Sequence, residues 1–246
     1  MKTKIILTVI SIGLLFFNSC DILKTETFSS FIVSYGETEK AVLNLTENGN
    51  ISISIKTIET CGYKSTGEKK IKYNELCEKN KDISYNKKLS YFSTPFETGE
   101  VARNVLNNLA TIKVTSDADF DEYHPAGSSL NDIMQFAGMS FSNFINNNYK
   151  NNYDWNANSV PQIYKIENIP YLKTTITPVY KLLSNMKKED FVLCTDLSYI
   201  FFTKKPSLAK VHNFKIKIVL DNGKSIPAYA LDNNGNELDF LKITFD

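Results

Sequence analysis

The densest group of side chains capable of chemistry lies in residues 115–132, TSDADFDEYHPAGSSLND. Four acidic residues and a histidine fall within eight positions of this stretch: Asp117, Asp119, Asp121, Glu122 and His124. Carboxylates at alternate positions are typical calcium ligands, but an EF-hand loop also needs glycine at its sixth position and glutamate at its twelfth. This chain has Glu122 and Ser128 there. The spacing therefore excludes an EF-hand loop and leaves a looser oxygen cage as an alternative.

Turn chemistry explains the same stretch in a second way. Aspartate side chains at the end of a strand accept hydrogen bonds from backbone N–H groups that the strand leaves unpaired. Residues 124–127, HPAG, fit a type I turn with proline second and glycine fourth, and Ser129 is a suitable helix N-cap. We interpret the stretch as a junction between a strand and a helix, and we predict neither a metal nor a cofactor.

A nucleophilic catalyst would have to use His124 or His212, the only histidines, because histidine normally activates a serine or cysteine nucleophile. His212 stands at the end of a predicted strand, HNFKIKI, where a surface or structural role is expected. The motifs GxSxG, GxxxxGK, GxGxxG and HExxH are absent. Paired carboxylates for glycoside hydrolysis are defined by their separation in space, so the sequence leaves that chemistry open. No catalytic residue is assigned.

The amino-terminal segment predicts export and lipid attachment. Two lysines precede the thirteen-residue apolar run IILTVISIGLLFF, and Cys20 follows it closely. The run is too short to span a bilayer, which needs about twenty apolar residues, and has the length of a signal-peptide core. The segment resembles bacterial lipoprotein signal peptides of the Bacteroidota type, although Phe17 and Asn18 replace the usual aliphatic and small residues. The alternative is an ordinary secretory signal in which Cys20 is incidental.

The lipoprotein resemblance implies a domain order and an address. Residues 1–19 would be the signal peptide, residues 20–28 a tether lipidated at Cys20, and residues 29–246 a single β-rich globular domain. Diacylation anchors a protein stably to a membrane. We therefore expect a cell-envelope protein that is held by its lipid and faces the periplasm or the cell exterior.

The charge balance limits the partners. The formal net charge is +1, and it becomes −1 without Lys2 and Lys4, the only charged residues before Cys20. A nearly neutral chain lacks the basic footprint that nucleic-acid binding requires. We expect contact with the membrane through the lipid, a protein or glycan partner, and no nucleic acid.

Three further cysteines follow the segment that ends at Cys20. Cys61 and Cys77 bracket GYKSTGEKKIKYNEL, a polar stretch with the composition of a flexible loop. In an oxidising compartment a disulfide between them would stabilise the fold by about 3 kcal/mol in the chain-entropy model. Cys194 offers competing pairings. The alternative is that all three are buried free thiols.

Alternating apolar residues predict two β-hairpins. The first is AVLNLTENGNISISIK, in which Asn48-Gly49 forms the turn and Ile51, Ile53 and Ile55 alternate after it. The second is FKIKIVLDNGKSIPAYAL, residues 214–231. Three shorter segments also have strand composition: ATIKVT, QIYKIEN and LSYIFFT.

Helical periodicity predicts three short helices. The segments are 98–110, TGEVARNVLNNLA, then 129–138, SLNDIMQFAG, and 177–188, TPVYKLLSNMKK. Each has apolar residues three and four apart and a serine or threonine at its start, and Gly138 is placed to end the second. Together with the hairpins they predict an α+β, β-dominant fold of antiparallel sheets, sandwich-like, with two or three short helices.

The segment FINNNYKNNYDWNAN is rich in asparagine and carries Tyr149, Tyr153 and Trp155. Aromatic faces beside amides can stack on and hydrogen-bond a sugar. The simpler interpretation, which we favour, is a polar surface loop whose rings pack onto the body.

Two stretches resemble uncharacterised envelope lipoproteins of the Bacteroidota. They are residues 110–136, around SDADF and PAGSSLND, and residues 195–226, around HNFKIKIVLDNGKSI. The resemblance implies an envelope address and a β-rich fold, and it transfers no activity. We expect a lipid-anchored, non-catalytic binding or structural module, with an anchored hydrolase of glycans or peptides as the alternative.

Overall fold

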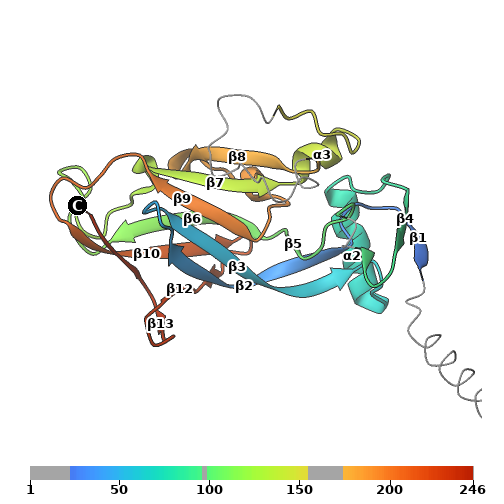
Figure 1. The fold of residues 1–246 in the computed structure, drawn as a ribbon, viewed down its shortest axis with the longest axis horizontal. Coiled ribbons are helices and arrows are strands. Elements are labelled where there is room, and N and C mark those ends of the chain that lie inside the picture. Colours follow the sequence, from blue (N-terminus) through green and yellow to red (C-terminus); the bar gives the residue numbers. More distant parts are fainter. Residues whose placement is uncertain (1–22, 96–98, 155–173, 246) are drawn as a thin grey trace, which may run out of the picture.

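Two β-sheets dominate the structure, which confirms the predicted α+β, β-dominant class (Figure 1). The computed structural model describes residues 23–95, 99–154 and 174–245. The larger sheet has eight strands in the order β13-β12-β2-β3-β9-β7-β8, with β5 beside β2. These strands are β2 (Ser34–Leu45), β3 (Ile51–Gly62), β5 (Val105–Leu106), β7 (Met134–Ser140), β8 (Thr177–Leu182), β9 (Leu197–Phe202), β12 (Ala228–Leu231) and β13 (Glu237–Leu238).

A four-stranded sheet is built around β10 (Val211–Leu220). One edge of β10 pairs with β6 (Leu109–Ser116), and the other pairs with β14 (Leu241–Thr244) and β11 (Ser225–Ile226). Alternate residues of β10 are buried, as a half-exposed strand requires. They join inward-facing residues of β2 and β3 in one hydrophobic core. The two sheets therefore pack in a sandwich-like way around a shared core.

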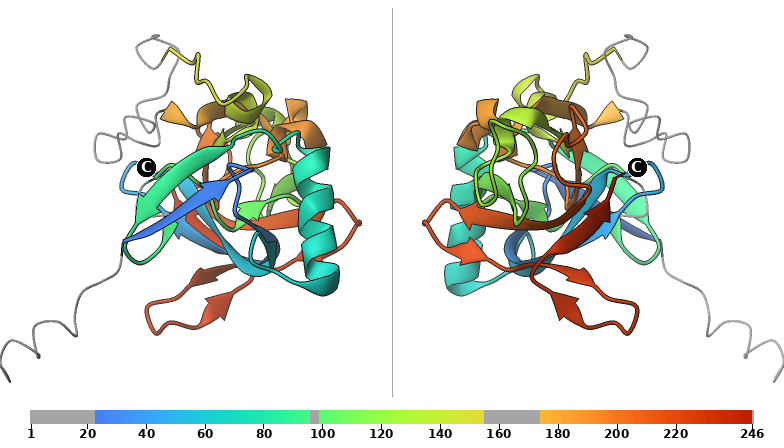
Figure 2. Two further views of the ribbon diagram at one scale, coloured as in Figure 1. Left: turned by 90° about the vertical axis from the view of Figure 1, so that its right-hand side faces the viewer. Right: turned by 90° about the vertical axis from the view of Figure 1, so that its left-hand side faces the viewer.

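A smaller unit occupies one end of the molecule. β1 (Lys24–Phe28) pairs with β4 (Lys87–Tyr91), and the helix α2 (Gly67–Lys79) lies beside them (Figure 2). The short helix α3 (Ser142–Asn146) follows β7 on the upper side in Figure 1. Three 3₁₀ turns complete the described elements: η3 (Asn131–Ile133), η6 (Leu183–Asn185) and η7 (Lys188–Phe191). A second core joins α2 and α3 to the beginning of β2, and the candidate site lies in this region.

The first predicted hairpin is confirmed. The second is confirmed only as far as Ile226, because residues 228–231 form β12, which pairs in parallel with β2 in the larger sheet. β2 and β3 pair from Ser34–Gly62 to Leu45–Ile51, and Gly49 takes a φ of 76° in the turn. Only glycine adopts this left-handed backbone without strain. The second hairpin pairs β10 with β11, and Gly223 takes a φ of 81°. Of the three shorter strands, ATIKVT falls in β6 and LSYIFFT in β9, whereas QIYKIEN lies outside the described residues.

The three predicted helices are wrong. Residues 98–110 contribute β5 and the start of β6, residues 129–138 contain η3 and most of β7, and residues 177–188 contain β8 and η6. Five of the seven residues of β7 are buried, and this strand lies between β8 and β9 in the larger sheet. Such a run of buried residues has the same composition in a strand and in a helix. Gly138 is inside β7, where a Cβ atom would lie 2.7 Å from the Phe136 ring.

The expected loop between Cys61 and Cys77 is wrong as well, because α2 occupies most of it. Only Tyr73 and Cys77, four positions apart, are buried on this helix. Two inward-facing residues make too narrow an apolar stripe to stand out in a sequence so rich in lysine and glutamate. Within the described residues the fold thus has two helices, α2 and α3, at positions that were not expected.

The folded body begins earlier than the predicted tether allows. Residues 24–28 form β1, whose Thr25 hydroxyl bonds the Ser90 hydroxyl of β4 at 2.9 Å. Residues 24–28 of the predicted tether therefore belong to the folded body, where they pair with β4. Cys20 and the predicted signal peptide lie outside the described residues. No helix in the described parts of the chain is long and apolar enough to cross a bilayer.

Candidate functional site

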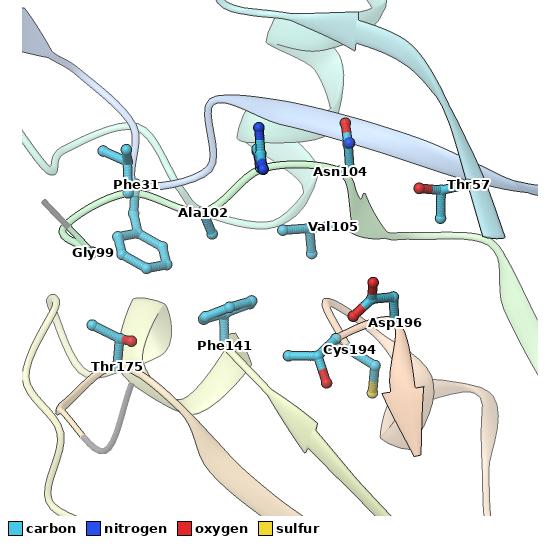
Figure 3. A pocket seen from close by; sticks show the side chains of 13 residues that line it. Phe31, Thr57, Gly99, Ala102, Asn104, Val105, Phe141, Thr175, Cys194 and Asp196 are labelled. Atoms are coloured by element: carbon cyan, nitrogen blue, oxygen red, sulfur yellow. The ribbon is translucent and has the colours of Figure 1, made fainter. Parts of the chain in front are cut away.

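A pocket of about 500 Å³ opens between the segment that leads into β5 and the segment around α3 (Figure 3). Figure 3 shows Phe31, Ala102 and Val105 on one side of the opening, and Phe141, Thr175 and Asp196 on the other. The ring centroids of Phe31 and Phe141 lie 5.4 Å apart. We call this the Phe31 pocket. Its size lies within the range of small-ligand sites.

Hydrogen bonds between neighbouring segments hold the walls of the Phe31 pocket. Asn104 has a φ of 50°, and its backbone N–H donates to the Ser34 hydroxyl at 3.0 Å. This bond helps to place Val105 beside Tyr35, where β5 pairs in parallel with β2. On the other wall, the Cys194 carbonyl accepts from the Leu106 N–H at 3.3 Å. The pocket therefore lies where the backbones of β5 and the segment before β9 meet.

A second pocket of about 730 Å³ adjoins the first, and the two share Gly99 and Thr175. Tyr85 and Tyr149 form its aromatic wall, with ring centroids 5.0 Å apart and planes tilted by 57°. We call this the Tyr149 pocket. Its polar lining includes Ser84, Asn86, Lys87, Glu100, Asn148 and Asn151.

Aromatic contacts join the two pockets. Phe31 contacts the ring of Phe141 in its own pocket and the ring of Tyr85 at 5.5 Å on the side of the Tyr149 pocket. Tyr85 in turn contacts Tyr149. Phe144 packs edge-on against Phe31 at 4.9 Å and against Tyr149 at 5.8 Å. Edge-to-face and tilted rings of this kind attract one another, so the aromatic residues form one continuous support.

A buried carboxylate, Asp82, holds lining residues of both pockets in place. Asp82 is fully buried and accepts hydrogen bonds from the backbone N–H groups of Phe31 at 2.8 Å and Ile32 at 2.7 Å. It also accepts one from the Tyr149 hydroxyl at 3.0 Å. Burial raises the pKa of Asp82, while these three hydrogen bonds act in the opposite direction. Because protein groups surround the carboxylate, its role is to position the chain.

Cys194 lines the Phe31 pocket but lacks the properties of a nucleophile. Complete burial raises the pKa of its thiol to about 12, and the thiol donates to the Asp190 carbonyl at 3.5 Å. The thiolate is the reactive form of cysteine. A thiol with this pKa stays protonated near neutral pH, so Cys194 acts as a core residue.

The acidic stretch forms turns, as the sequence interpretation proposes. Asp121 accepts hydrogen bonds from the backbone N–H groups of Tyr123 and His124 at 2.9 and 3.1 Å, and Asp119 accepts one from Ala126 at 2.7 Å. Asp117 instead bonds Asn213 of β10. Among the described residues no group of three or more histidine, cysteine, aspartate or glutamate side chains is placed to hold a metal ion.

The turn in this stretch differs in position from the predicted one. The Ser128 N–H donates to the Pro125 carbonyl at 3.0 Å, so the turn spans residues 125–128, one residue later. Gly127 is its third residue and has a φ of 81°, which a type II turn requires at that place. The helix expected from Ser129 is replaced by η3.

His124 is held between two carboxylates. Its Nδ1 lies 2.7 Å from an oxygen of Asp121, and its Nε2 lies 3.1 Å from Asp132. The other Asp121 oxygen pairs with the Lys204 amine at 2.7 Å. Burial disfavours the imidazolium, but the hydrogen bonds to Asp121 and Asp132 outweigh it and raise the pKa of His124. With both nitrogens engaged, the ring joins the turn to η3.

His212 is structural, and the alternative of a surface position is wrong. The ring is fully buried, with Nδ1 2.8 Å from the Ser116 hydroxyl and Nε2 2.9 Å from the Ala209 carbonyl. Catalytic triads also contain a serine hydrogen-bonded to a histidine. Here Ser116 is also buried, and neither residue lines either of the two pockets. This pair cannot reach a substrate in the folded state.

Of the remaining predicted residues, only Cys194 and Tyr149 line one of the two pockets within the described parts of the chain. Cys61, Cys77 and Cys194 are free, buried thiols in the structure, which matches the alternative to a disulfide between Cys61 and Cys77. Tyr149 packs its ring onto the body, as the simpler interpretation of the asparagine-rich segment proposes, and it lines a pocket as well. Tyr153 is half-buried, and Trp155 lies outside the described residues.

The site residues that the sequence does not single out are Phe31, Asp82, Tyr85 and the only arginine, Arg103. They come from separate segments and belong to no spaced motif. The one available signal is asparagine at left-handed positions, since Asn86, Asn104 and Asn148 all have positive φ and all line the pockets. The chain matches none of the protein-family models, curated proteins or solved structures with which it was compared.

Proposed function

We propose that this protein is a lipid-anchored, non-catalytic component of the cell envelope that binds a ligand in the adjoining Phe31 and Tyr149 pockets. The observation that carries the binding role is their shared, aromatic-backed lining, which has a combined size suited to an extended ligand. The envelope address rests on the amino-terminal sequence that ends at Cys20.

The lining chemistry favours binding over catalysis. The carboxylates that line the pockets are Asp196 in the first and Glu100 in the second, and Glu100 forms an ion pair with Lys87. Glycoside hydrolysis needs two carboxylates facing one bond, and peptide hydrolysis needs an activated nucleophile or water. Neither histidine lines these pockets. An anchored hydrolase of glycans or peptides remains the competing function that the experiment must separate.

The anchor is tested by metabolic labelling of the full chain. Radiolabelled palmitate should enter the wild-type protein, and the Cys20→Ala variant should take up none and leave the membrane fraction. Cys194→Ala is a suitable control, because it removes a cysteine that the structure buries. Equal labelling of wild type and Cys20→Ala would disprove lipidation at this position.

The binding role is tested with the full-length protein in a detergent that lacks a sugar headgroup. The protein is mixed with a panel of neutral oligosaccharides, acidic oligosaccharides and short peptides, and amide hydrogen exchange is followed. A bound ligand should slow exchange in residues 99–106 and 141–149 and should be recovered intact. The binding role is wrong if no ligand protects these segments, and cleavage of the ligand would favour the hydrolase.

A further inference from the structure

We propose that the Tyr149 pocket binds a neutral carbohydrate chain, with sugar rings stacked on Tyr85 and Tyr149 and their hydroxyl groups bonded by Asn86 and Asn148. This inference rests on the proposed binding function and specifies the ligand class. Four properties of the pocket carry it: fixed aromatic faces, unpaired amides, strained backbone and balanced charge.

The two tyrosine rings are fixed before any ligand arrives. The Tyr85 hydroxyl donates to the Glu100 carbonyl, and the Tyr149 hydroxyl donates to Asp82 while accepting from the Ser84 N–H at 3.2 Å. Both hydroxyl groups are thus used inside the protein, and each ring is half-buried. What remains for a ligand is the aromatic surface. A rigid aromatic surface costs little conformational entropy on binding and suits the apolar face of a sugar ring.

Two asparagine side chains supply the polar complement. Asn86 and Asn148 line the Tyr149 pocket and are exposed, and neither amide is hydrogen-bonded to any other described residue. An amide presents both a donor and an acceptor, which is what a hydroxyl group of a sugar needs. The amides therefore stand beside the rings with their hydrogen-bonding capacity unused.

Backbone strain gathers around the two pockets. The structure describes six non-glycine residues with positive φ, at Lys81, Asn86, Asn104, Asn148, Tyr149 and Leu193. Asn86, Asn148 and Tyr149 line the Tyr149 pocket, and Asn104 lines the Phe31 pocket. Asparagine tolerates this conformation, but a bulky residue such as Tyr149, with a φ of 59°, does so only at a cost. Strain of this kind is typically retained where it positions a functional surface.

Charge balance specifies a neutral ligand. Each pocket is lined by one basic and one acidic side chain: Arg103 and Asp196 in the Phe31 pocket, Lys87 and Glu100 in the Tyr149 pocket. Lys87 and Glu100 also neutralise each other directly. An anionic polymer would therefore meet no net attraction. The shared border at Gly99 and Thr175 allows a chain of several sugars to continue from one pocket into the other.

The test uses isothermal titration of neutral oligosaccharides, acidic oligosaccharides and short peptides into the full-length protein. Tyr149→Ala should weaken the binding of a neutral oligosaccharide by about tenfold or more, because it removes one stacking surface. Tyr149→Phe keeps the ring, so it should bind better than Tyr149→Ala. Tyr123→Ala is the control, since Tyr123 is exposed and lies outside both pockets.

The double variant Asn86→Gly/Asn148→Gly distinguishes a loss of ligand contacts from a loss of folding. Glycine accepts the positive φ at both positions, so the backbone is kept while the amides are removed. We expect an unchanged melting temperature and binding weakened by about tenfold or more. Unaltered binding in this variant and in Tyr149→Ala overturns the assignment of the site.

The outcomes separate this inference from the proposed function. Binding of acidic oligosaccharides or peptides alone, with protection of residues 99–106 and 141–149, would leave the binding module in place and overturn the neutral carbohydrate. Absence of binding by every member of the panel would count against both. Binding of a neutral oligosaccharide that Tyr149→Ala weakens supports both.

Discussion

The Tyr149 hydroxyl donates a hydrogen bond to the buried carboxylate of Asp82 at 3.0 Å. The same carboxylate accepts the backbone N–H groups of Phe31 and Ile32. Phe31 lines one pocket and Tyr149 lines the other, so Asp82 connects the two positions from behind. The geometry of the adjoining pockets thus depends on a buried residue that lines neither of them.

The variant Asp82→Asn should destabilise the protein and loosen both pockets. An amide replaces one acceptor oxygen with a donor, so a backbone N–H or the Tyr149 hydroxyl loses its buried partner. Leaving a buried polar group unsatisfied costs about 1–3 kcal/mol. We expect a loss of about 2 kcal/mol in the free energy of unfolding, measured by urea denaturation.

Asp239→Asn is the control for this substitution. Asp239 makes an exposed ion pair with Lys215, with 68% of its side chain accessible. Exposed pairs contribute about 1 kcal/mol or less. A loss in Asp82→Asn no larger than in Asp239→Asn would contradict the positioning role of Asp82.

The hairpins could be predicted because their information is local. Residues 51–55 alternate with period two beside Asn48-Gly49, and Ile51 and Ile53 are fully buried as that alternation requires. The positions of the helices could not be predicted, because packing against the rest of the molecule determines which segments become helical. In β7 the small residues Gly138 and Ser140 lie on the buried face and Met139 lies on the less buried face, so its alternation does not show in the sequence. The helix α2 needs only Tyr73 and Cys77 to pack against the body.

The turns of the acidic stretch could be predicted because they also depend on local contacts: Asp121 accepts hydrogen bonds from backbone N–H groups two and three residues away. The pockets could not be predicted from the sequence. Phe31, Asp82, Tyr85 and Tyr149 meet through long-range contacts that neither spacing nor composition encodes. The asparagines of the Tyr149 pocket carry a weak signal, because asparagine is tolerated in left-handed backbone.

The stability of the protein should fall as the pH rises through the titration of His124. Its pKa is raised in the folded state, so its contribution is fully present below about pH 6.5, the usual value in an unfolded chain. The contribution is lost as the pH rises through the folded value. Melting temperatures should therefore decline above pH 6.5.

The variant His124→Gln isolates this contribution. Glutamine keeps a hydrogen-bonding side chain but does not titrate, so the difference in melting temperature between wild type and variant should shrink from pH 6 to pH 9. At acid pH the stability of the wild-type protein should also fall, because Asp121 becomes protonated. Its pKa is lowered by the hydrogen bond from Lys204, which burial opposes, and by His124. Stability from Asp121 is present above about pH 4 and is lost as the pH falls further. If the difference in melting temperature between wild type and His124→Gln is the same from pH 6 to pH 9, the assignment to His124 is wrong.

The three cysteines of the folded body should react with a thiol reagent only after unfolding. Burial raises the pKa of Cys61 and Cys77, as it does for Cys194. Alkylation at pH 7.5 without reductant should therefore label none of them in the native protein and all three in urea, as counted by mass spectrometry. If only one is labelled in urea, a disulfide has formed between two of them.

The facing lysines Lys113 and Lys217 should be a point of instability. They lie directly opposite each other where β6 pairs with β10, and both are exposed. Like charges in this arrangement destabilise a sheet, and opposite charges contribute about 0.2–1 kcal/mol. Lys217→Glu should therefore raise the free energy of unfolding by about 0.5 kcal/mol, and more at low salt because ions screen exposed charges.

Lys215→Glu is the matched control for the facing lysines, because it changes the same charge two residues earlier on the same strand. Lys215 already pairs with Asp239 at 2.8 Å, so its reversal replaces an attraction with a repulsion. It should lower the free energy of unfolding or leave it unchanged. If Lys217→Glu and Lys215→Glu shift the urea midpoint by the same amount, net charge decides the effect. If only Lys217→Glu stabilises, the repulsion between Lys113 and Lys217 is the cause.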